Sequence, residues 1–350
     1  EINNKIQKVR TADIVATLEE KASRSHDVIW SMQELFEAIK SGKYFLCDNS
    51  KTQLYQKLGL PVNMMARIEK CGNANLKSEL IREMMKYYDS NEGKIFVRME
   101  KLNHPEKGQI EKVRAILSDN YVKIDNLPVI SSLSKGLGDE ILVRSWVNDD
   151  NSMRLEVIID DRFELGMHDG KPDVFFPSLS FQNSETGNSS FNILYGLYRQ
   201  FCSNGCVSLH KSLGNENIRH IGKDKNVIID RMEDYNLHQI ADKSKGMIDM
   251  FKNAKGIYVA KLEDEVEYIG EESDLPKKII EGAKRLADFK YREKNLFDAF
   301  GAITESIHTS SDASVHVRMD REKVATKVFN ERLSDYASGK VKVVEAIVRQ

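Results

Sequence analysis

Apolar and polar residues alternate most regularly in the segment 177–210, and this alternation predicts β-strands. Leu179 and Phe181 alternate with polar neighbours, and the alternation resumes at Phe191 after a polar, glycine-containing stretch. Such a pattern is typical of two strands joined by a loop. An apolar run follows the Asn-Gly turn signal at 204–205, so we expect a third strand to return beside the second.

The same period-two pattern recurs earlier in the chain. Residues 141–147 and 153–159 flank a polar stretch rich in Asp and Asn, which predicts a hairpin. Two further strands are expected at 94–99 and 113–118. Together these segments predict a central antiparallel sheet that extends from about residue 94 to residue 210.

Both ends of the chain carry apolar residues at three- and four-residue steps, the spacing of amphipathic helices. Ile14 and Leu18 belong to one such series and Met32 and Leu35 to another, with a polar loop expected at 22–27 between them. After residue 223, helical spacing predicts four further helices, over residues 227–251, 276–308, 320–334 and 340–348. We therefore expect helices before the sheet and a mostly helical C-terminal region.

A helix, a glycine turn and a second helix are predicted between residues 51 and 70. The first helix ends at Gly59, and Pro61 opens the second at a position where proline is favourable. This is the outline of a helix-turn-helix, a motif that places its second helix in the major groove of DNA. Most helical hairpins only pack into a core, so the pattern leaves both interpretations open.

These patterns predict an α+β protein with a central antiparallel sheet, N-terminal helices and a mostly helical C-terminal region. We expect three regions in a chain of 350 residues, which is longer than one average domain. Residues 1–93 form the helical N-terminal region with its helix-turn-helix-like hairpin, residues 94–222 the sheet, and residues 223–350 the helical C-terminal region.

Charge and cysteine content narrow the class of protein. The 52 basic and 54 acidic residues leave a formal net charge of -2, so a nucleic-acid-binding face must come from local clustering. The four cysteines are too few and too irregularly spaced for a disulfide scaffold. No apolar run approaches the roughly 20 residues that span a bilayer. We expect a cytoplasmic protein without a membrane partner and, because the chain does not begin with Met, a leader before Glu1.

Six segments carry a family resemblance, and they cover most of the chain from about residue 53 onward. They read QLYQKLGLPVNMMARI (53–68), VRAILSDNYVKIDN (113–126), NSETG (183–187), RQFCSNG (199–205), RHIG (219–222) and LFDAFGAITE (296–305). In this order they resemble a bacterial and phage family, domain of unknown function 932, also titled phage/plasmid-like protein. The family has no established reaction, and its setting among replication and recombination genes of mobile elements implies DNA handling.

The leading functional hypothesis is that the protein binds single-stranded nucleic acid, and we expect this to be DNA. Such a protein would act in annealing or recombination as a homo-oligomer. Such proteins need cations for phosphates and aromatic rings for bases in one groove. Tyr121, Trp146 and Tyr198 are the expected stacking residues. The cations expected to contact phosphates are Arg114, Lys123, Arg144, Arg199, Arg219 and Lys223. The alternative for each residue is a core aromatic or a charge at the rim of the core.

A metal-dependent nuclease or another hydrolase is the alternative from a different class. It would use carboxylates to hold Mg²⁺ and a histidine for proton transfer. The candidates are Asp119, Asp125, Glu185 and His220. Asp119 and Asp125 also suit turn and cap positions, where carboxylates accept bonds from backbone N–H groups, and we favour that interpretation.

Cysteine chemistry and polar turns complete the set of candidates. The spacing of Cys202 and Cys206 departs from structural zinc sites even with His210 and His220 nearby, and the resembled family has an apolar residue at 206. A Cys202 nucleophile lacks an orienting group, so we predict no metal site and no cofactor. Residues 183–187 and 202–205 fit tight turns and polar pockets equally well. A structural or assembly protein without nucleic-acid binding is the third hypothesis.

Overall fold

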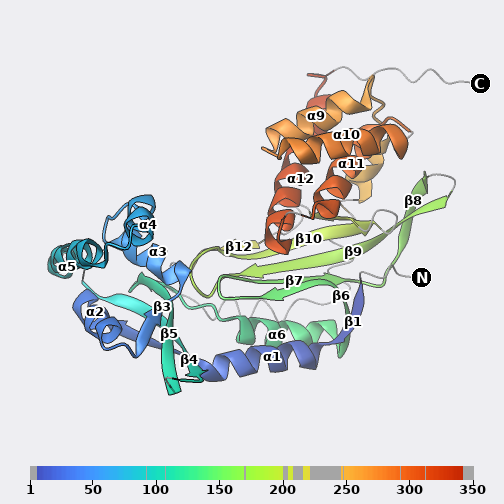
Figure 1. Ribbon diagram of the computed structural model, residues 1–350. Coiled ribbons are helices and arrows are strands. Elements are labelled where there is room, and N and C mark those ends of the chain that lie inside the picture. Colours follow the sequence, from blue (N-terminus) through green and yellow to red (C-terminus); the bar gives the residue numbers. More distant parts are fainter. Residues whose placement is uncertain are drawn as a thin grey trace, which may run out of the picture.

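The computed structural model describes residues 6–91, 93–106, 108–168, 171–199, 204–207, 216–220, 246, 248–291, 293–311 and 313–341. These residues form a large sheet, a small sheet with its own helices, and a C-terminal group of helices (Figure 1). The α+β class with helices at both ends of the chain is therefore confirmed. Within the described part of the chain, no helix combines the length and apolar character needed to cross a bilayer.

The large sheet has the strand order β1-β6-β7-β9-β10-β11, and β8 pairs with β9 and β12 with β10. All its pairings are antiparallel, and the hairpins predicted around residues 148–152 and 183–190 are confirmed. Three short strands, β1, β8 and β12, were not predicted, because three to six residues carry little periodic signal. The strands are β1 (Gln7–Arg10), β6 (Glu140–Asn148), β7 (Met153–Ile158), β8 (Phe163–His168), β9 (Lys171–Asn183), β10 (Phe191–Arg199), β11 (Asn204–Val207) and β12 (Glu216–Ile218).

The small sheet shows that one continuous sheet from 94 to 210 was a wrong expectation. Its strand order is β2-β4-β5-β3, and only β3 pairs in parallel. The two edges of β4 are occupied by β2 and β5, so β4 and β5 cannot join the large sheet. The loop expected at 22–27 was also wrong, because its second half pairs with β4. The strands are β2 (Ser25–Trp30), β3 (Tyr44–Leu46), β4 (Ile95–His104) and β5 (Gly108–Ser118).

Four helices pack against the small sheet and share its apolar core. They are α2 (Met32–Lys40), α3 (Asp48–Lys57), α4 (Val62–Lys70) and α5 (Ala74–Asn91). Each contributes fully buried side chains, for example Leu35, Leu54, Met65 and Met85, which meet Val97 and its neighbours from the strands. We call residues 25–118 the small-sheet module.

The two faces of the large sheet are covered in chemically different ways. Helices α1 (Thr11–Arg24) and α6 (Asn126–Leu137) lie together on one face, where Ile14 and Leu133 meet Leu155 and Phe181 in an apolar core (Figure 1). Alternation along β7 and β9 places polar side chains such as Arg154, Glu156 and Ser180 on the other face, all of them buried.

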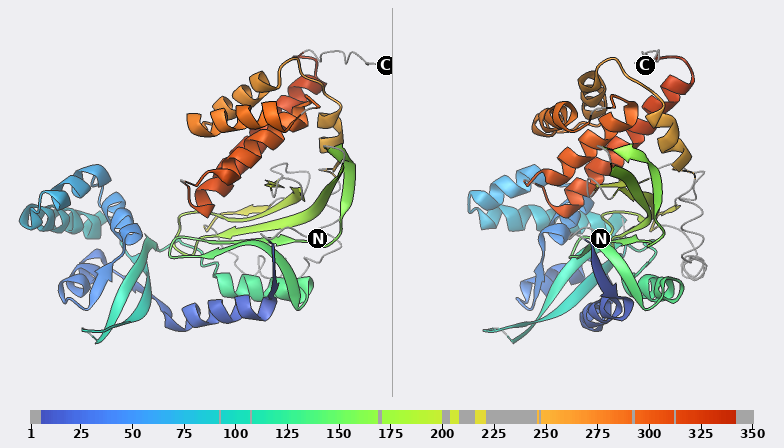
Figure 2. Two further views of the ribbon diagram at one scale, coloured as in Figure 1. Left: turned by 45° about the vertical axis from the view of Figure 1, so that its right-hand side comes forward. Right: turned by 90° about the vertical axis from the view of Figure 1, so that its right-hand side faces the viewer.

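The C-terminal helices lie over this polar face (Figure 2). They are α9 (Leu262–Glu272), α10 (Lys277–Phe289), α11 (Leu296–Thr309) and α12 (Val315–Ala337), and they share an aromatic core around Phe251 and Phe300. Ion pairs link them to the sheet, with Arg154 Nη2 2.8 Å from Asp320 Oδ1. The helical C-terminal region is confirmed for residues 248–341. The helix predicted over 227–251 lies mostly outside the described residues, as does the one over 340–348.

Candidate functional site

Several residues singled out from the sequence meet where the small-sheet module joins the large sheet. They come from β5, from the connection between β5 and α6, from the β9–β10 loop and from the residues after β12. The residues that the structure brings together are Arg114, Tyr121, Lys123, Asp125, Glu185 and His220. We call this region the junction.

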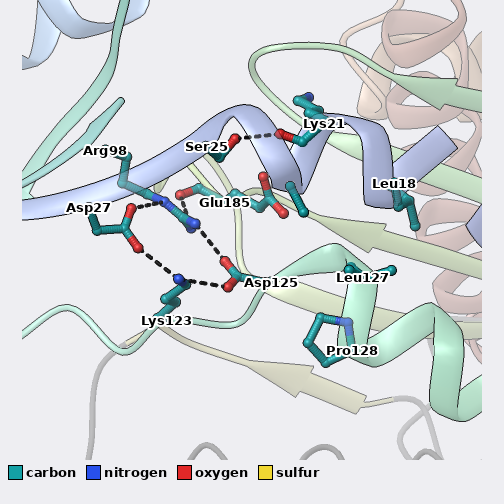
Figure 3. A pocket seen from close by; sticks show the side chains of 11 residues that line it. Leu18, Lys21, Ser25, Asp27, Arg98, Lys123, Asp125, Leu127, Pro128 and Glu185 are labelled. Carbon is teal, nitrogen blue, oxygen red and sulfur yellow. Dashed lines mark hydrogen bonds and ion pairs between the residues drawn. The ribbon is translucent and has the colours of Figure 1, made fainter. Parts of the chain in front are cut away.

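Arg98 is the centre of the junction, and sequence reasoning missed it. Its guanidinium donates to Asp27 Oδ1 at 3.1 Å, to Asp125 Oδ1 at 2.6 Å and to the main-chain oxygen of Glu185 at 3.0 Å (Figure 3). Lys123 Nζ lies 2.7 Å from Asp27 and 3.0 Å from Asp125, which closes a ring of alternating charges. The sequence did contain a signal for it, because Arg98 is a charged residue within the otherwise apolar strand 95–99, and a buried charge requires a partner.

A second ion pair lies beside this ring. Arg114 Nη2 donates to Glu185 Oε2 at 3.1 Å, and Glu185 Oε1 accepts the backbone N–H of Asn126 at 3.0 Å. The Glu185 carboxylate therefore satisfies the first turn of α6 and a buried arginine at once. Arg114 is 1% exposed, so its charge depends on this carboxylate for compensation.

The junction contains a small cavity of about 170 Å³, and it is lined by equal numbers of basic and acidic side chains. Lys21 lines it together with the ring of Arg98, Lys123 and their carboxylates (Figure 3). Burial opposes ionisation of Asp125, but the charges of Arg98 and Lys123 outweigh it and hold the pKa of Asp125 below its ordinary value. Burial, with the charge of Arg114, lowers the pKa of Lys21. The arrangement suits a fixed structural ion-pair network more than a site that exchanges ligands.

The β9–β10 loop is a structural turn that connects the large sheet to the small-sheet module. Ser184 and Thr186 are fully buried, and the Ser184 hydroxyl donates to Asn151 O at 2.6 Å. Gln53 of α3 donates to Thr186 O at 2.7 Å. Gly187 has φ of 78°, a conformation that favours glycine. The turn interpretation of 183–187 is therefore correct, although this loop also lines cavities on both sides. Residues 202 and 203 lie outside the described residues.

Tyr121 and His220 form a closed aromatic stack. The two rings are 5.0 Å apart and nearly parallel, and Phe96 stacks on the Tyr121 ring from 5.8 Å. Because Phe96 and His220 both stack on the Tyr121 ring, this ring is not free to stack on a base, and that expectation was wrong. The nitrogens of His220 face Val122 O and Asn183 Oδ1, both at 3.1 Å, and burial lowers the pKa of His220. This histidine serves as a structural bridge.

Four further residues expected to contact nucleic acid are buried, which corrects their assignment. Arg144 pairs with Glu156 at 2.7 Å, and its side chain is 9% exposed. Arg199 pairs with Asp173 at 2.7 Å, and its side chain is 2% exposed. Arg114 is compensated by Glu185, and Tyr198 is fully buried. Each cation pairs with a carboxylate that lies 12 to 71 residues away in the sequence, and composition does not reveal such a pairing.

The remaining expected contacts divide into three groups. Trp146 is half-buried against the core of the large sheet. Arg219 is exposed, and Lys123 keeps 41% of its side chain exposed despite its ion pairs. Lys223 lies outside the described residues. Of the residues expected to contact nucleic acid, only Arg219 is exposed and has no partner among the described residues.

The carboxylates proposed for a hydrolase do not form a metal site. Asp119 is exposed in the turn after β5, whereas Asp125 and Glu185 are held by Arg98 and Arg114. Among the described residues, no group of three His, Cys, Asp or Glu side chains is placed to bind a metal ion. Cys202 and His210 lie outside the described residues, and so does the side chain of Cys206.

The α3–α4 hairpin is built around a short turn and a shared apolar inner side. Four residues, 58–61, connect the helices, and Gly59 adopts φ of 66°. Leu54, Leu58, Leu60 and Met65 are all buried and form the inner side of the hairpin.

The opposite side of α4 is exposed. Asn63, Arg67 and Lys70 are exposed at spacings of four and three residues, which places them on one helix face. The one acidic neighbour, Glu69, is bonded to Lys77 and to the Tyr55 hydroxyl.

Comparisons with protein-family models, with curated proteins and with solved structures find no match for this chain. Membership of the phage/plasmid-like family therefore stays a prediction.

Proposed function

We propose that this protein binds duplex DNA through the α3–α4 hairpin, with α4 as the helix that enters the major groove. The observation that carries the proposal is the face of Asn63, Arg67 and Lys70, which is exposed and has no partner within the described residues. Arginine and asparagine are the side chains that most often read base edges, and lysine and arginine bind phosphates.

Local charge at α4 supports the same surface. Arg67 and Lys70 are exposed there. The small-sheet module carries 15 Lys and Arg residues against 12 Asp and Glu residues, but this excess of three includes Arg98 and Arg114, which are buried and paired with carboxylates from outside the module. The binding of Glu69 by Lys77 removes the one carboxylate that would repel a phosphate beside Lys70. Weak but local positive charge of this kind steers a protein to DNA.

The hairpin is also mounted rigidly, as a reading helix requires. Gln53 on α3 accepts the backbone N–H of Ile116 at 2.8 Å and donates to Thr186 O at 2.7 Å. These two bonds tie α3 to β5 and to the junction at once. The orientation of α4 is then set by the buried side chains that α3 and α4 share.

Fluorescence anisotropy with a labelled random-sequence duplex and its separated strand tests the proposal at several salt concentrations. The double variant Arg67→Glu/Lys70→Glu should weaken duplex binding by roughly tenfold or more and lower the salt slope by about one for each lost phosphate contact. The matched control reverses two exposed cations of α10, Lys277→Glu/Arg285→Glu, and should change neither quantity.

Two outcomes would overturn the proposal. One is unchanged duplex affinity in the folded α4 double variant. The other is tight binding of the single strand with no binding of the duplex, which would favour the single-strand hypothesis, including annealing by an oligomer. A binding-site selection then refines the proposal, because Asn63→Ala should alter the preferred sequence more than the affinity for random duplex.

A further inference from the structure

A groove of about 380 Å³ lies on the side of the junction away from the ion-pair ring. It is bordered by the end of β5, by the loop after Gly187 and by the residues that follow β12. The polar groups that line it are Ser118, Asn188, Ser189, Ser190, Arg219 and His220. None of these described lining residues is acidic.

The charge of this groove differs from that of every buried cluster described above. Arg98, Arg114, Arg144 and Arg199 each have a carboxylate within 3.1 Å. Arg219 is exposed at the groove and has no such partner among the described residues. A guanidinium without a counter-charge, in a groove without acids, favours an anionic ligand.

The neutral groups of the groove add hydrogen-bond donors. The Ser189 hydroxyl oxygen is buried and makes no hydrogen bond in the described part of the chain. Ser118 and Ser190 add two more hydroxyls, whereas the Asn188 amide already donates to Asn151 Oδ1 and Thr186 Oγ1, both at 3.4 Å. Several hydroxyl donors around one guanidinium match the oxygens of a phosphate group, each of which accepts more than one bond.

The walls of the groove are fixed before any ligand arrives. Asn188 donates its backbone N–H to Ser184 Oγ at 3.0 Å. A Cβ atom at Gly187 would lie 2.6 Å from Leu117 Cδ2, so the loop packs directly on β5. The Tyr121–His220 stack forms the adjoining wall. Because these walls are already ordered, binding a ligand would cost little conformational entropy, and this favours affinity for the ligand.

We propose that this groove binds a phosphate ester, with Arg219 and the surrounding hydroxyl groups as its phosphate ligands. The phosphate belongs either to a free nucleotide or to a nucleic-acid strand, since both present the same group. The site is separate from the α4 face and does not depend on duplex recognition.

Isothermal titration calorimetry of the full chain tests the proposal with four probes: inorganic phosphate, adenosine monophosphate, adenosine and a short single-stranded oligonucleotide. Native protein should bind the phosphorylated probes and not adenosine. Arg219→Ala should weaken binding by about tenfold or more, because the charge-assisted bonds are lost. The control Arg285→Ala removes another exposed guanidinium, from α10, and should bind as the native protein does.

The remaining comparisons assign the source of the phosphate. Similar affinity for the mononucleotide and the oligonucleotide indicates a free nucleotide, and much tighter oligonucleotide binding indicates a strand. Ser189→Ala should weaken binding less than Arg219→Ala. The proposal is overturned if native protein binds no phosphorylated probe, or if Arg219→Ala binds as tightly as native. The α4 double variant should keep this binding, so failure here and failure of duplex binding are distinguishable.

Discussion

Asp298 is a buried carboxyl group whose protonation is linked to folding. It lies in the first turn of α11 with no exposed surface, and burial, helped by the charge of Glu293, raises its pKa to about 6. In the unfolded chain the ordinary value of 3.8 applies. Between these two values the folded state holds a proton that the unfolded state does not, so this group adds stability as the pH falls from 7 towards 4.

Replacing Asp298 by Asn should remove this contribution to the pH dependence. The variant keeps a neutral side chain at every pH, so at pH 8 its free energy of unfolding should exceed that of the native protein by up to about 3 kcal/mol. At pH 4 the two should converge. Urea unfolding at several pH values measures the difference, and Asp288→Asn on the exposed side of α10 is the control. Parallel curves for native and variant would contradict the pKa shift.

Single residues also show how far sequence reasoning can reach. Lys123, Asp125, Glu185 and His220 drew attention because titratable side chains stood beside turn signals, and the structure brings them together. Their roles could not be predicted, because the group that organises them is Arg98. Asp27 is its direct partner across β2 and β4, and this register depends on a pairing between segments that are 71 residues apart.

At the scale of elements, α3 depends on one side chain for its attachment to two other segments. Gln53 accepts the backbone N–H of Ile116 and donates to the main-chain oxygen of Thr186, whereas Gln56, three residues further along the helix, is exposed. Gln53→Ala would leave a backbone donor of β5 and a backbone acceptor of the β9–β10 loop without their partner. Such losses in partly buried positions are more serious than the loss of an exposed amide.

We expect Gln53→Ala to lower the free energy of unfolding by about 1–3 kcal/mol. Gln56→Ala, three residues along the same helix, should change it by no more than about 0.5 kcal/mol, since exposed substitutions seldom do more. Chemical denaturation of both variants provides the comparison. If the two variants were equally stable, the attachment of α3 would have to come from its apolar contacts alone.

Elements with a strong period were predicted, and those defined by distant partners were not. The hairpin β6–β7 and the α3–α4 hairpin follow from local pattern and turn residues. Ser25, His26 and Asp27 were assigned to a loop because they are polar, yet they form the first half of β2. Their backbone groups pair with Met99 and its neighbours. The side chains of Ser25 and Asp27 accept bonds from Arg114 and Arg98 at the junction. Tertiary pairing thus decided the conformation against local propensity.

At the scale of the whole molecule, Glu185 joins the two sheets. It compensates Arg114 from the small-sheet module and accepts the first N–H of α6, which packs on the large sheet. Glu185→Ala would leave a guanidinium that is 1% exposed without its counter-charge. Removing one partner of a buried pair generally costs about 3–5 kcal/mol, because the remaining charge stays buried.

Glu185→Ala should therefore lower the free energy of unfolding by about 3–5 kcal/mol. Glu106→Ala, in the exposed β4–β5 turn, should leave it unchanged. Denaturation measures the stability, and limited proteolysis should show earlier cleavage near the junction. A variant as stable as the native protein would mean that water or Ser25 replaces the carboxylate as the partner of Arg114.

The division of the molecule also differs from what the sequence suggested. The expected boundary at residue 93 separated the predicted helices from the predicted strands. In the structure, β4 and β5 share a core with the helices that precede them. The reason is that β2 and β3, which are short or polar, carry too little pattern to reveal the sheet that they complete. The fold class could be predicted from local patterns, whereas the number of sheets required knowledge of strand partners.

The pairing of β1 with β6 has a consequence for the order of folding. Arg10 lies opposite Glu140, so this contact closes a loop of 130 residues. The small-sheet module is an insert within that loop, and Asp27 in its first strand is joined to Lys123, just after its last strand, by an ion pair of 2.7 Å. Once this ion pair has formed, only about 34 residues remain in the loop between the two strands, which lowers the entropic cost of closure by about 1 kcal/mol. The large sheet therefore closes more readily after the insert has formed than before it.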